Sequence, residues 1–373
     1  MMDRRASEVD PSVRASAMAL EDLGWNVSRD EEFGPFREKG FEPGRVAVED
    51  KHRSVVLTAH GEYFGHTPGR LLHEARSLAD LPKVGDWLAL SILPNERKAV
   101  IQQILPRRSK LSRKVPGRDT HEQILAANVD IVFLVQALDA TFNPRLVERQ
   151  LVMVHKSGAR PVVVLNKEDL CQSLSKDLAA AASASGGAPV VTVSAKTGRD
   201  MDRLTSLIRP GETIVFIGPS GVGKSTLINR LYGRAIQATA EVRERDSKGR
   251  HTTAWRELIL LPQGGMLIDT PGLRELQLWT EGQGVGEAFP DIENLASYCR
   301  FRDCSHIHEA DCAVKEAVAR GTLPPERYGN YLKLEGELAQ LEAAQNERAL
   351  INRKQETKTA QRAFNKFKRP PEQ

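Results

Sequence analysis

The feature that most constrains this chain of 373 residues is one glycine-rich loop. Residues 218–225 match the pattern G-x-x-x-x-G-K-[ST] in full. The loop follows an expected strand, Thr213–Ile217, and opens an expected helix from Lys224. In such a loop, backbone N–H groups turn inward around phosphates, the lysine approaches the β- and γ-phosphates, and the hydroxyl binds Mg²⁺. The predicted nucleotide-binding residues here are Gly218, Pro219, Ser220, Gly221, Val222, Gly223, Lys224, Ser225 and Thr226.

A second phosphate-side element follows the expected strand Met266–Ile268 and reads Asp269-Thr270-Pro271-Gly272. A carboxylate at the end of a strand beside a phosphate loop is suited to a Mg²⁺ site. We therefore predict that Asp269 joins Ser225 in holding magnesium. The N–H of Gly272 is expected to approach the γ-phosphate.

The base-reading signal is Asn166-Lys167-Glu168-Asp169, at the end of the expected strand Pro161–Leu165. The Asp169 carboxylate can accept from guanine N1–H and the 2-amino group together, which adenine cannot match. Asn166 is expected at the other ring edge, and the Lys167 stem over the base. After the next strand, the backbone N–H groups of the motif Ser194-Ala195-Lys196 are expected at guanine O6.

The order of these motifs is unusual, because the base-reading motifs precede the phosphate loop in this chain. Circular permutation leaves a folded site unchanged when the original termini lie close together. It also moves the D-T-P-G element to the end of the nucleotide-binding domain. That element then leads directly into the cysteine- and histidine-rich segment, so a change of nucleotide state can alter the position of that segment.

The following segment is rich in cysteine and histidine. Cys299, Cys304 and Cys312 are close in sequence to His306 and His308. In a cytosolic protein this pattern indicates a metal and not disulfides. Three cysteines and one histidine make a closed tetrahedral Zn²⁺ set, which is typical of a structural site.

The remaining sequence suggests further domains. Short β-rich runs at 45–48, 54–58, 86–92 and 99–104, separated by turns, predict a small barrel, most simply of the OB type. Alternating strands and helices predict a doubly wound parallel sheet, and 325–366 reads as helix. We expect an N-terminal extension (1–44), an OB-type barrel (45–106), a basic linker (107–120), the permuted nucleotide-binding domain (121–280) and a zinc-binding domain with a helical basic tail (281–373).

Charge and hydropathy indicate the kind of partner. The net charge is only +4, but basic residues gather at 107–118 and 348–369, where they can contact phosphates or simply be solvated. No apolar run is long enough to span a bilayer, and the first twenty residues lack the apolar core of a signal peptide. We therefore expect a cytoplasmic monomer that binds RNA and no membrane.

From Arg45 to Ala317 the chain resembles the ribosome small subunit-dependent GTPase A (RsgA) family. The resemblance rests on N-K-E-D, S-A-K, G-P-S-G-V-G-K-S-T, G-R-H-T-T, D-T-P-G and C-x4-C-x-H-x5-C, together with the β-barrel. It implies an OB domain, a permuted GTPase domain and a zinc domain. It further implies a GTP-driven switch in late maturation of the small (30S) ribosomal subunit, with contacts to its rRNA and hydrolysis stimulated by it.

The resemblance also implies roles for single residues. Residues 249–253 are similar to the switch I element, in which Thr252 or Thr253 completes Mg²⁺ coordination; we favour Thr253. Leu273 stands where many GTPases carry a water-orienting glutamine, and His251 is the implied substitute. With Lys224, His251 is therefore a predicted catalytic residue. The family's spacing favours His306 over His308 as the fourth zinc ligand.

Two other functions remain compatible with single motifs. A metabolic P-loop kinase or ATPase would share the phosphate loop, although N-K-E-D argues against it. A non-catalytic, GTP-sensing RNA-binding module is compatible with Leu273, which offers no polar group to a water molecule.

Overall fold

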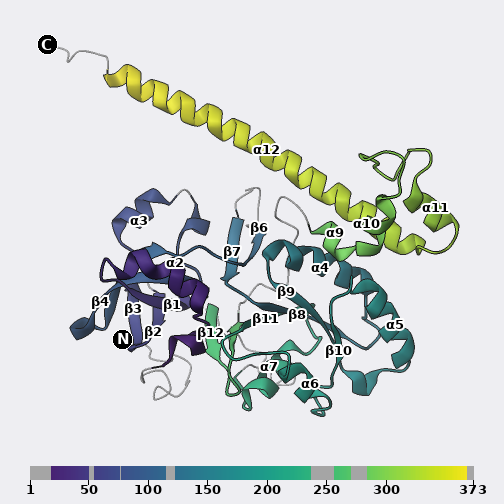
Figure 1. Ribbon diagram of the computed structural model, residues 1–373, viewed down its shortest axis with the longest axis horizontal. Coiled ribbons are helices and arrows are strands. Elements are labelled where there is room, and N and C mark those ends of the chain that lie inside the picture. The colour runs from purple at the N-terminus through teal and green to yellow at the C-terminus, as the bar shows by residue number, and fades with distance from the viewer. Residues whose placement is uncertain are drawn as a thin grey trace, which may run out of the picture.

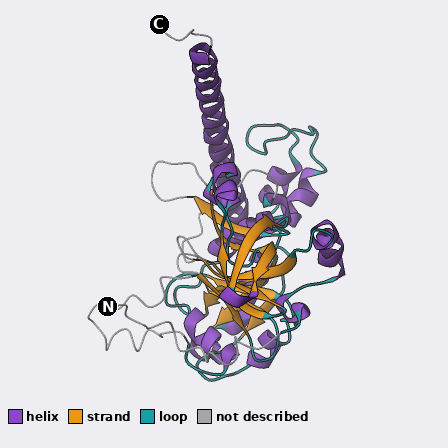
Figure 2. Cartoon of the chain, turned by 90° about the vertical axis from the view of Figure 1, so that its left-hand side faces the viewer, coloured by secondary structure: helices purple, strands orange, loops and turns teal. Residues whose placement is uncertain are grey.

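The structure is a computed structural model that describes residues 18–49, 54–75, 77–114, 122–236, 256–269 and 284–367. A strand-rich body carries helices around it, and one long helix projects away from that body (Figures 1 and 2). Within the described residues, no helix has both the length and the apolar character required to cross a membrane.

The N-terminal strands form a closed five-stranded barrel. Strand β1 pairs with both β2 and β4, and β5 closes the circle between β3 and β4. The strands are β1 (Glu42–Glu49), β2 (Ser54–Thr58), β3 (Gly61–His66), β4 (Trp87–Leu93) and β5 (Lys98–Ile104). Their inward side chains form a small apolar core, which includes Val46, Val56, Leu88, Leu90 and Ile101. The predicted OB-type barrel is confirmed, and β3 is a strand that the turn signal at Gly61 concealed.

Six more strands form the second part of the same sheet, in the order β10-β9-β8-β11-β13-β12. All neighbours are parallel except β12 and β13. The bounds are β8 (Ile131–Ala137), β9 (Arg160–Asn166), β10 (Val190–Thr192), β11 (Thr213–Ile217), β12 (Arg256–Leu260) and β13 (Met266–Asp269).

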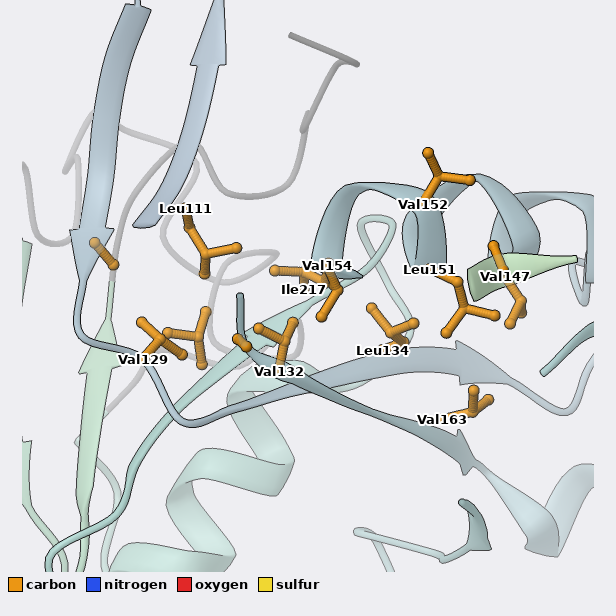
Figure 3. Packing of buried hydrophobic residues seen from close by; sticks show 14 of the residues in the cluster. Leu111, Val129, Val132, Leu134, Val147, Leu151, Val152, Val154, Val163 and Ile217 are labelled. Carbon is orange, nitrogen blue, oxygen red and sulfur yellow. The ribbon is translucent and has the colours of Figure 1, made fainter. Parts of the chain in front are cut away.

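Helices cover both faces of this parallel sheet, because successive side chains of a strand point to opposite faces. Val132 and Leu134 of β8 pack with Val147 and Leu151 of α4 on one face (Figure 3). Phe133 of β8 packs in a separate cluster on the other face, with side chains of α6 and α7. The helices are α4 (Pro144–Ser157), α5 (Leu174–Ala184), α6 (Met201–Thr205) and α7 (Lys224–Tyr232). The predicted doubly wound sheet is therefore confirmed.

The barrel and the parallel sheet are joined by main-chain pairing between β1 and β12. The fully buried Arg45 of β1 reinforces this junction. Among the described residues its hydrogen-bond acceptors are all uncharged: Leu23 O, Gly85 O, Asn128 O, Thr213 Oγ1 and Met266 Sδ. Burial lowers the pKa of Arg45 to about 10, which still leaves it charged at neutral pH. One guanidinium thus connects the N-terminal segment, the barrel and two strands of the parallel sheet.

Part of the stretch expected as a basic linker is folded. Strand β6 (Lys110–Lys114) pairs with β7 (Glu122–Ala127) in a separate two-stranded sheet. Arg107 forms an ion pair with the buried Asp86, with 2.7 Å between Nη2 and Oδ2. A basic run is thus no reliable sign of a solvated linker, because a buried carboxylate elsewhere in the chain can pair with its arginine.

The N-terminal extension also packs on this body in its described part. It contains the 3₁₀ turn η1 (Leu20–Leu23) and helix α2 (Val27–Arg37). Trp25 and Phe33 are buried there, and Trp25 lies edge-on to Trp87 of β4 at 4.8 Å between ring centroids. Between the barrel strands lie α3 (Gly69–Glu74) and the short turns η2 (Leu78–Asp80) and η3 (Pro94–Glu96); η4 (Glu168–Leu170) follows β9.

The C-terminal part is helical, as predicted, with α9 (Val285–Ala288), α10 (Pro290–Ala296), α11 (Ala313–Ala319) and α12 (Pro325–Phe367). Arg327 of α12 forms ion pairs with the buried Glu148 of α4 and with Asp291 of α10. Because Glu148 belongs to α4, which covers one face of the parallel sheet, this buried contact fixes the C-terminal helices to that helix layer.

We predict that Arg45→Met lowers the free energy of unfolding by roughly 3 kcal/mol or more, because several buried oxygens lose their donor. Urea unfolding followed by circular dichroism measures the change. Arg160→Met is the matched control: Arg160 pairs with Glu212 at the surface, with 46% of its side chain exposed, so its loss is expected to change the stability by less than about 1 kcal/mol. Equal effects of the two substitutions would contradict the role of Arg45.

Candidate guanine-nucleotide site and metal centre

The predicted nucleotide residues gather at one edge of the sheet. Strands β8, β9, β11 and β13 run parallel, so their carboxyl ends lie along the same edge. Asn166 ends β9, Asp269 ends β13, and the phosphate loop follows β11. Open parallel sheets bind ligands at this edge. The fold thus brings together motifs that are far apart in the sequence.

The phosphate loop requires glycine at two tight positions. Gly218 has φ 148° and Gly223 has φ 95°, which side-chain-bearing residues rarely adopt. A Cβ at Gly218 would lie 2.3 Å from Val135 O, and one at Gly223 would lie 2.3 Å from Asn166 Nδ2. Any larger residue would therefore push the loop away from β8 and from Asn166.

Lys224 folds over its own loop. Its Nζ donates to Gly218 O at 2.8 Å and to Pro219 O at 2.6 Å, so the ammonium lies across the loop that is to hold phosphates. Ser225 and Thr226 follow it in the first turn of α7, both half-buried. The N–H groups of a helix's first turn and a positive charge beside them favour an anion.

Asn166 connects the two recognition loops. Its side chain is buried; Nδ2 donates to Val222 O at 2.8 Å, and Oδ1 accepts from the N–H of Ala195 at 3.0 Å. Sequence reasoning gave Asn166 a place at the guanine ring edge and missed this bridging contact. The bridge sets the spacing between the phosphate loop and the S-A-K loop.

Asp169 and Ser194 are also in contact, with Ser194 Oγ donating to Asp169 Oδ1 at 2.5 Å. Ser194 itself is buried, whereas Asp169 is exposed and can accept from a base. From α7, Arg230 donates to Ala195 O and Lys196 O, which holds the S-A-K loop against the phosphate-loop helix. The N-K-E-D and S-A-K motifs are thus assembled as one unit.

Asp139 is a site residue that sequence reasoning missed. It follows β8 and pairs with Lys167, with 2.9 Å between Oδ2 and Nζ. Hydrogen bonds from Thr141, together with the Lys167 ammonium, lower the pKa of Asp139 to about 2, so it is ionised at neutral pH. Its position just beyond the carboxyl end of a strand was the only available signal.

His251, Thr252, Thr253 and Gly272 lie outside the described residues, as does Leu273. Asp269 is described, and its backbone pairs with Glu257 of β12.

The predicted metal ligands form one cluster. The donor atoms of Cys299, Cys304, His306 and Cys312 all lie within 4.8 Å of one another. The Sγ atoms of Cys299 and Cys312 are 3.8 Å apart, and His306 Nδ1 lies 3.6 Å and 3.4 Å from them. Tetrahedral bonds of about 2.3 Å to sulfur and about 2.0 Å to nitrogen give edges close to these values. The group can therefore hold a metal ion.

The competing histidine, His308, is not part of this cluster among the described residues; its backbone N–H donates to the neighbouring Glu309. The ligand loop is held in place by α12, because Tyr328 Oη donates to His306 O at 2.6 Å. His306 has φ 62°, a left-handed conformation that turns its ring toward the cysteines. The choice of His306 over His308 agrees with this geometry.

Together these observations define the class of protein: a P-loop nucleotide-binding fold with guanine-type loops in permuted order, joined to an OB-type barrel. The model of the family described as RsgA GTPase matches residues 104–279. The chain belongs to this family and is a GTPase, which rules out the alternative of a metabolic kinase.

Relatives of nearly the same length support this assignment. The chain is 46% identical over 331 residues to "Small ribosomal subunit biogenesis GTPase RsgA" of Opitutus terrae, covering 86% of this chain and 90% of that protein. It is 40% identical over 360 residues to the protein of that name from Syntrophotalea carbinolica, covering 94% and 98%. Among solved structures, YjeQ from Thermotoga maritima is similar, with a TM-score of 0.62, 28% identity, and coverage of 80% of this chain and 99% of that one.

We predict that Asn166→Ala weakens GDP binding about 100-fold, which corresponds to roughly 3 kcal/mol, because two buried backbone groups lose their partner and the recognition loops separate. Titration with a fluorescent GDP analogue measures this change. Asn294→Ala on α10, an exposed position, is the control and should bind GDP normally. Unchanged affinity in Asn166→Ala would contradict the bridging role.

Proposed function

We propose that this protein is a GTP-driven switch in late maturation of the small (30S) ribosomal subunit, and that the subunit stimulates its hydrolysis. The observation that carries the proposal is the assembled guanine-type site on a sheet that is hydrogen-bonded to an OB-type barrel. Relatives over almost the whole chain are named for biogenesis of this subunit. The protein is proposed to work as a monomer in the cytoplasm, where ribosomes are assembled.

The geometry of the loops supports the nucleotide roles that we propose. Residues 218–226 cradle the phosphates, Lys224 leaves its loop carbonyls for the β- and γ-phosphates, and Asp169 reads the guanine. With Asn166 buried between the loops, base recognition is proposed for Asp169, under the stem of Lys167. The N–H groups of Ala195 and Ser194 donate to Asn166 Oδ1 and to Arg199 O, so they are not proposed at guanine O6. Ser225, Thr253 and Asp269 are the proposed Mg²⁺ set, and Gly272 is proposed at the γ-phosphate. Magnesium would neutralise the charge that develops on the phosphates.

Hydrolysis is proposed to depend on His251, since Leu273 offers the attacking water no hydrogen bond. An imidazole can orient or deprotonate water near neutral pH. Slow turnover by the isolated protein is expected, because no glutamine occupies the position after D-T-P-G.

We predict that His251→Ala lowers GTP turnover about 100-fold while GDP and GTP affinities stay within about twofold, because only the water loses its partner. Phosphate release under saturating GTP measures turnover, and nucleotide titration measures binding. His308→Ala is the control, because that imidazole lies outside both sites. Normal turnover in His251→Ala would remove the assignment.

Zinc is the metal proposed for the cysteine-rich cluster. Three sulfurs and one nitrogen suit Zn²⁺, and four protein ligands leave no position for water, which makes the site structural. Apolar side chains in and beside the ligand loop, such as Tyr298 and Ile307, are exposed. Apolar packing therefore contributes little to the stability of this segment, and metal binding is proposed to supply it.

We predict about one zinc per chain in protein purified without added metal. Cys304→Ser should lose this zinc and make the 299–312 loop sensitive to proteolysis. Cys171→Ser, outside the cluster, should keep both the metal and the resistance. A metal-free native protein, or a Cys304→Ser protein with full zinc, would contradict the proposal.

The barrel has a direct mechanical connection to the nucleotide side. Arg256 starts β12 and forms an ion pair with Glu49 of β1, 3.2 Å from Nη1 to Oε2; Glu49 also pairs with Lys83 at 2.5 Å. In sequence, β12 follows the predicted switch I residues closely. A partner that binds the barrel can therefore influence the proposed catalytic histidine through β12.

We predict that the protein sediments with isolated small subunits more strongly with a non-hydrolysable GTP analogue than with GDP, since the γ-phosphate biases the switch elements. Binding should weaken as salt is raised, because phosphate contacts release counterions. Equal sedimentation in both nucleotide states would contradict the switch, and no sedimentation in either state would contradict the ribosomal partner.

A further inference from the structure

The loops that follow β8 and β9 begin side by side at the nucleotide edge of the sheet. Ala137, the last residue of β8, is the register partner of Asn166, the last residue of β9, and the N–H of Leu138 donates to Asn166 O at 2.8 Å. Asp139 and Lys167 are therefore among the first residues of two neighbouring loops. Their side chains meet there, with 2.9 Å between Oδ2 and Nζ.

The Asp139 carboxylate is oriented by its own loop. Its Oδ1 accepts from the backbone N–H of Thr141 at 2.9 Å and from the Thr141 hydroxyl at 2.5 Å, whereas Oδ2 accepts from Lys167 Nζ. Ion pairs between exposed and mobile side chains are weak, but only 25% of the Asp139 side chain is exposed. The carboxylate therefore needs no rearrangement to hold the lysine.

Lys167 has an unusual backbone conformation that directs its side chain. Its φ is 64°, in the left-handed region that residues with a side chain rarely adopt. Such a conformation persists where surrounding contacts compensate for its strain. On the backbone side, Lys167 O accepts from the N–H of Leu170 at 2.9 Å, and the N–H of Glu168 donates to Val193 O at 3.2 Å. The ion pair with Asp139 holds the other end of the residue.

The pair lies on the path that a bound nucleoside has to cross. Strand β8 lies between β9, which carries the N-K-E-D loop, and β11, which precedes the phosphate loop. A nucleotide with its base at Asp169 and its phosphates in residues 218–226 therefore spans the end of β8. Lys167 leaves β9 in the same direction, and Asp139, beyond the end of β8, holds its ammonium. The stem of Lys167 thus runs along the proposed position of the nucleoside.

We infer that Asp139 is a positioning residue for the guanine nucleotide, which holds the Lys167 ammonium and so fixes the Lys167 stem over the bound nucleoside. A lysine that is ordered only when the ligand binds loses rotamer freedom, and a stem that is fixed in advance avoids this loss. Asp139 acts through Lys167 and does not contact the nucleotide. The inference rests on the proposed function for the position of the base at Asp169.

The experiment is a double-mutant cycle on the full-length protein, with release of tritiated GDP into excess unlabelled GDP as the readout. Asp139→Asn keeps the size of the side chain and removes its charge, and Lys167→Met keeps an apolar stem and removes the ammonium. Each single substitution should speed GDP release about tenfold. The double variant should be within about twofold of the faster single variant, because both substitutions remove the same contact.

Two outcomes of the cycle would overturn the inference. One is a double variant that releases GDP about 100-fold faster than the wild type, because the two residues would then act independently. The other is an unchanged release rate in Asp139→Asn. Glu96→Gln is the matched control: it breaks a carboxylate–lysine pair of 2.6 Å with Lys98 on the barrel and should release GDP at the wild-type rate.

Steady-state GTP turnover separates positioning from a general effect on the fold. Asp139→Asn should raise KM about tenfold and leave kcat within about twofold, because an interaction made equally with bound GTP and with the transition state is lost. A misfolded variant would instead lose active sites, which lowers kcat. A lower kcat with unchanged KM would place Asp139 in the chemical step and overturn the inference.

Competition by ADP tests the underlying assignment of the base site. If ADP displaces labelled GDP as well as unlabelled GDP does, base reading by Asp169 is wrong, whereas a non-additive release cycle still supports the Asp139–Lys167 pair. If only GDP competes and the cycle is additive, base reading stands and the positioning role of Asp139 is wrong.

Discussion

The junction between the barrel and the GTPase sheet depends on one buried guanidinium. Arg45 is held by uncharged oxygens from separate parts of the chain, and these acceptors come together only in the complete fold. Burying a charge without a carboxylate is unfavourable unless its hydrogen bonds are all made. The N-terminal segment, β1 and β11 therefore must be in place at the same time. The barrel and the sheet form one folding unit and not two independent domains joined by a flexible linker.

The nucleotide site, at the carboxyl ends of the parallel strands, also depends on a few buried hydrogen bonds. Asn166 fixes the distance between the phosphate loop and the S-A-K loop. The absence of a side chain at Gly223 leaves room for the Asn166 amide beside the phosphate loop. Circular permutation leaves this arrangement intact, because the contacts are spatial and not sequential. Permutation changes only the position of the chain ends, so the sequence after β13 leads to the candidate metal centre. Arg327, further along the chain, forms an ion pair with Glu148 of α4.

Much of this could be read from the sequence where local chemistry decides the structure. The strands Ser54–Thr58 and Thr213–Ile217 and the helix start at Lys224 agree with prediction, because β-branched runs and glycine loops mark them. Strand β3 was hidden by the glycine at its start. Strand β6 was hidden by its basic residues, because it forms a strand only through its pairing with β7. The bridging of Asn166 and the Asp139–Lys167 pair depend on which strands become neighbours, and residue type alone does not give that.

One hydrogen-bonded body carries an OB-type barrel, a guanine-nucleotide site and a C-terminal cluster of three cysteines and one histidine that can hold a metal ion. The central claim is that a partner bound to that body controls hydrolysis. The most direct test is GTP turnover by the intact protein with and without isolated small ribosomal subunits, with large subunits as the control. The account predicts slow turnover alone, acceleration by small subunits and no acceleration by large ones. Turnover that is indifferent to small subunits would contradict it.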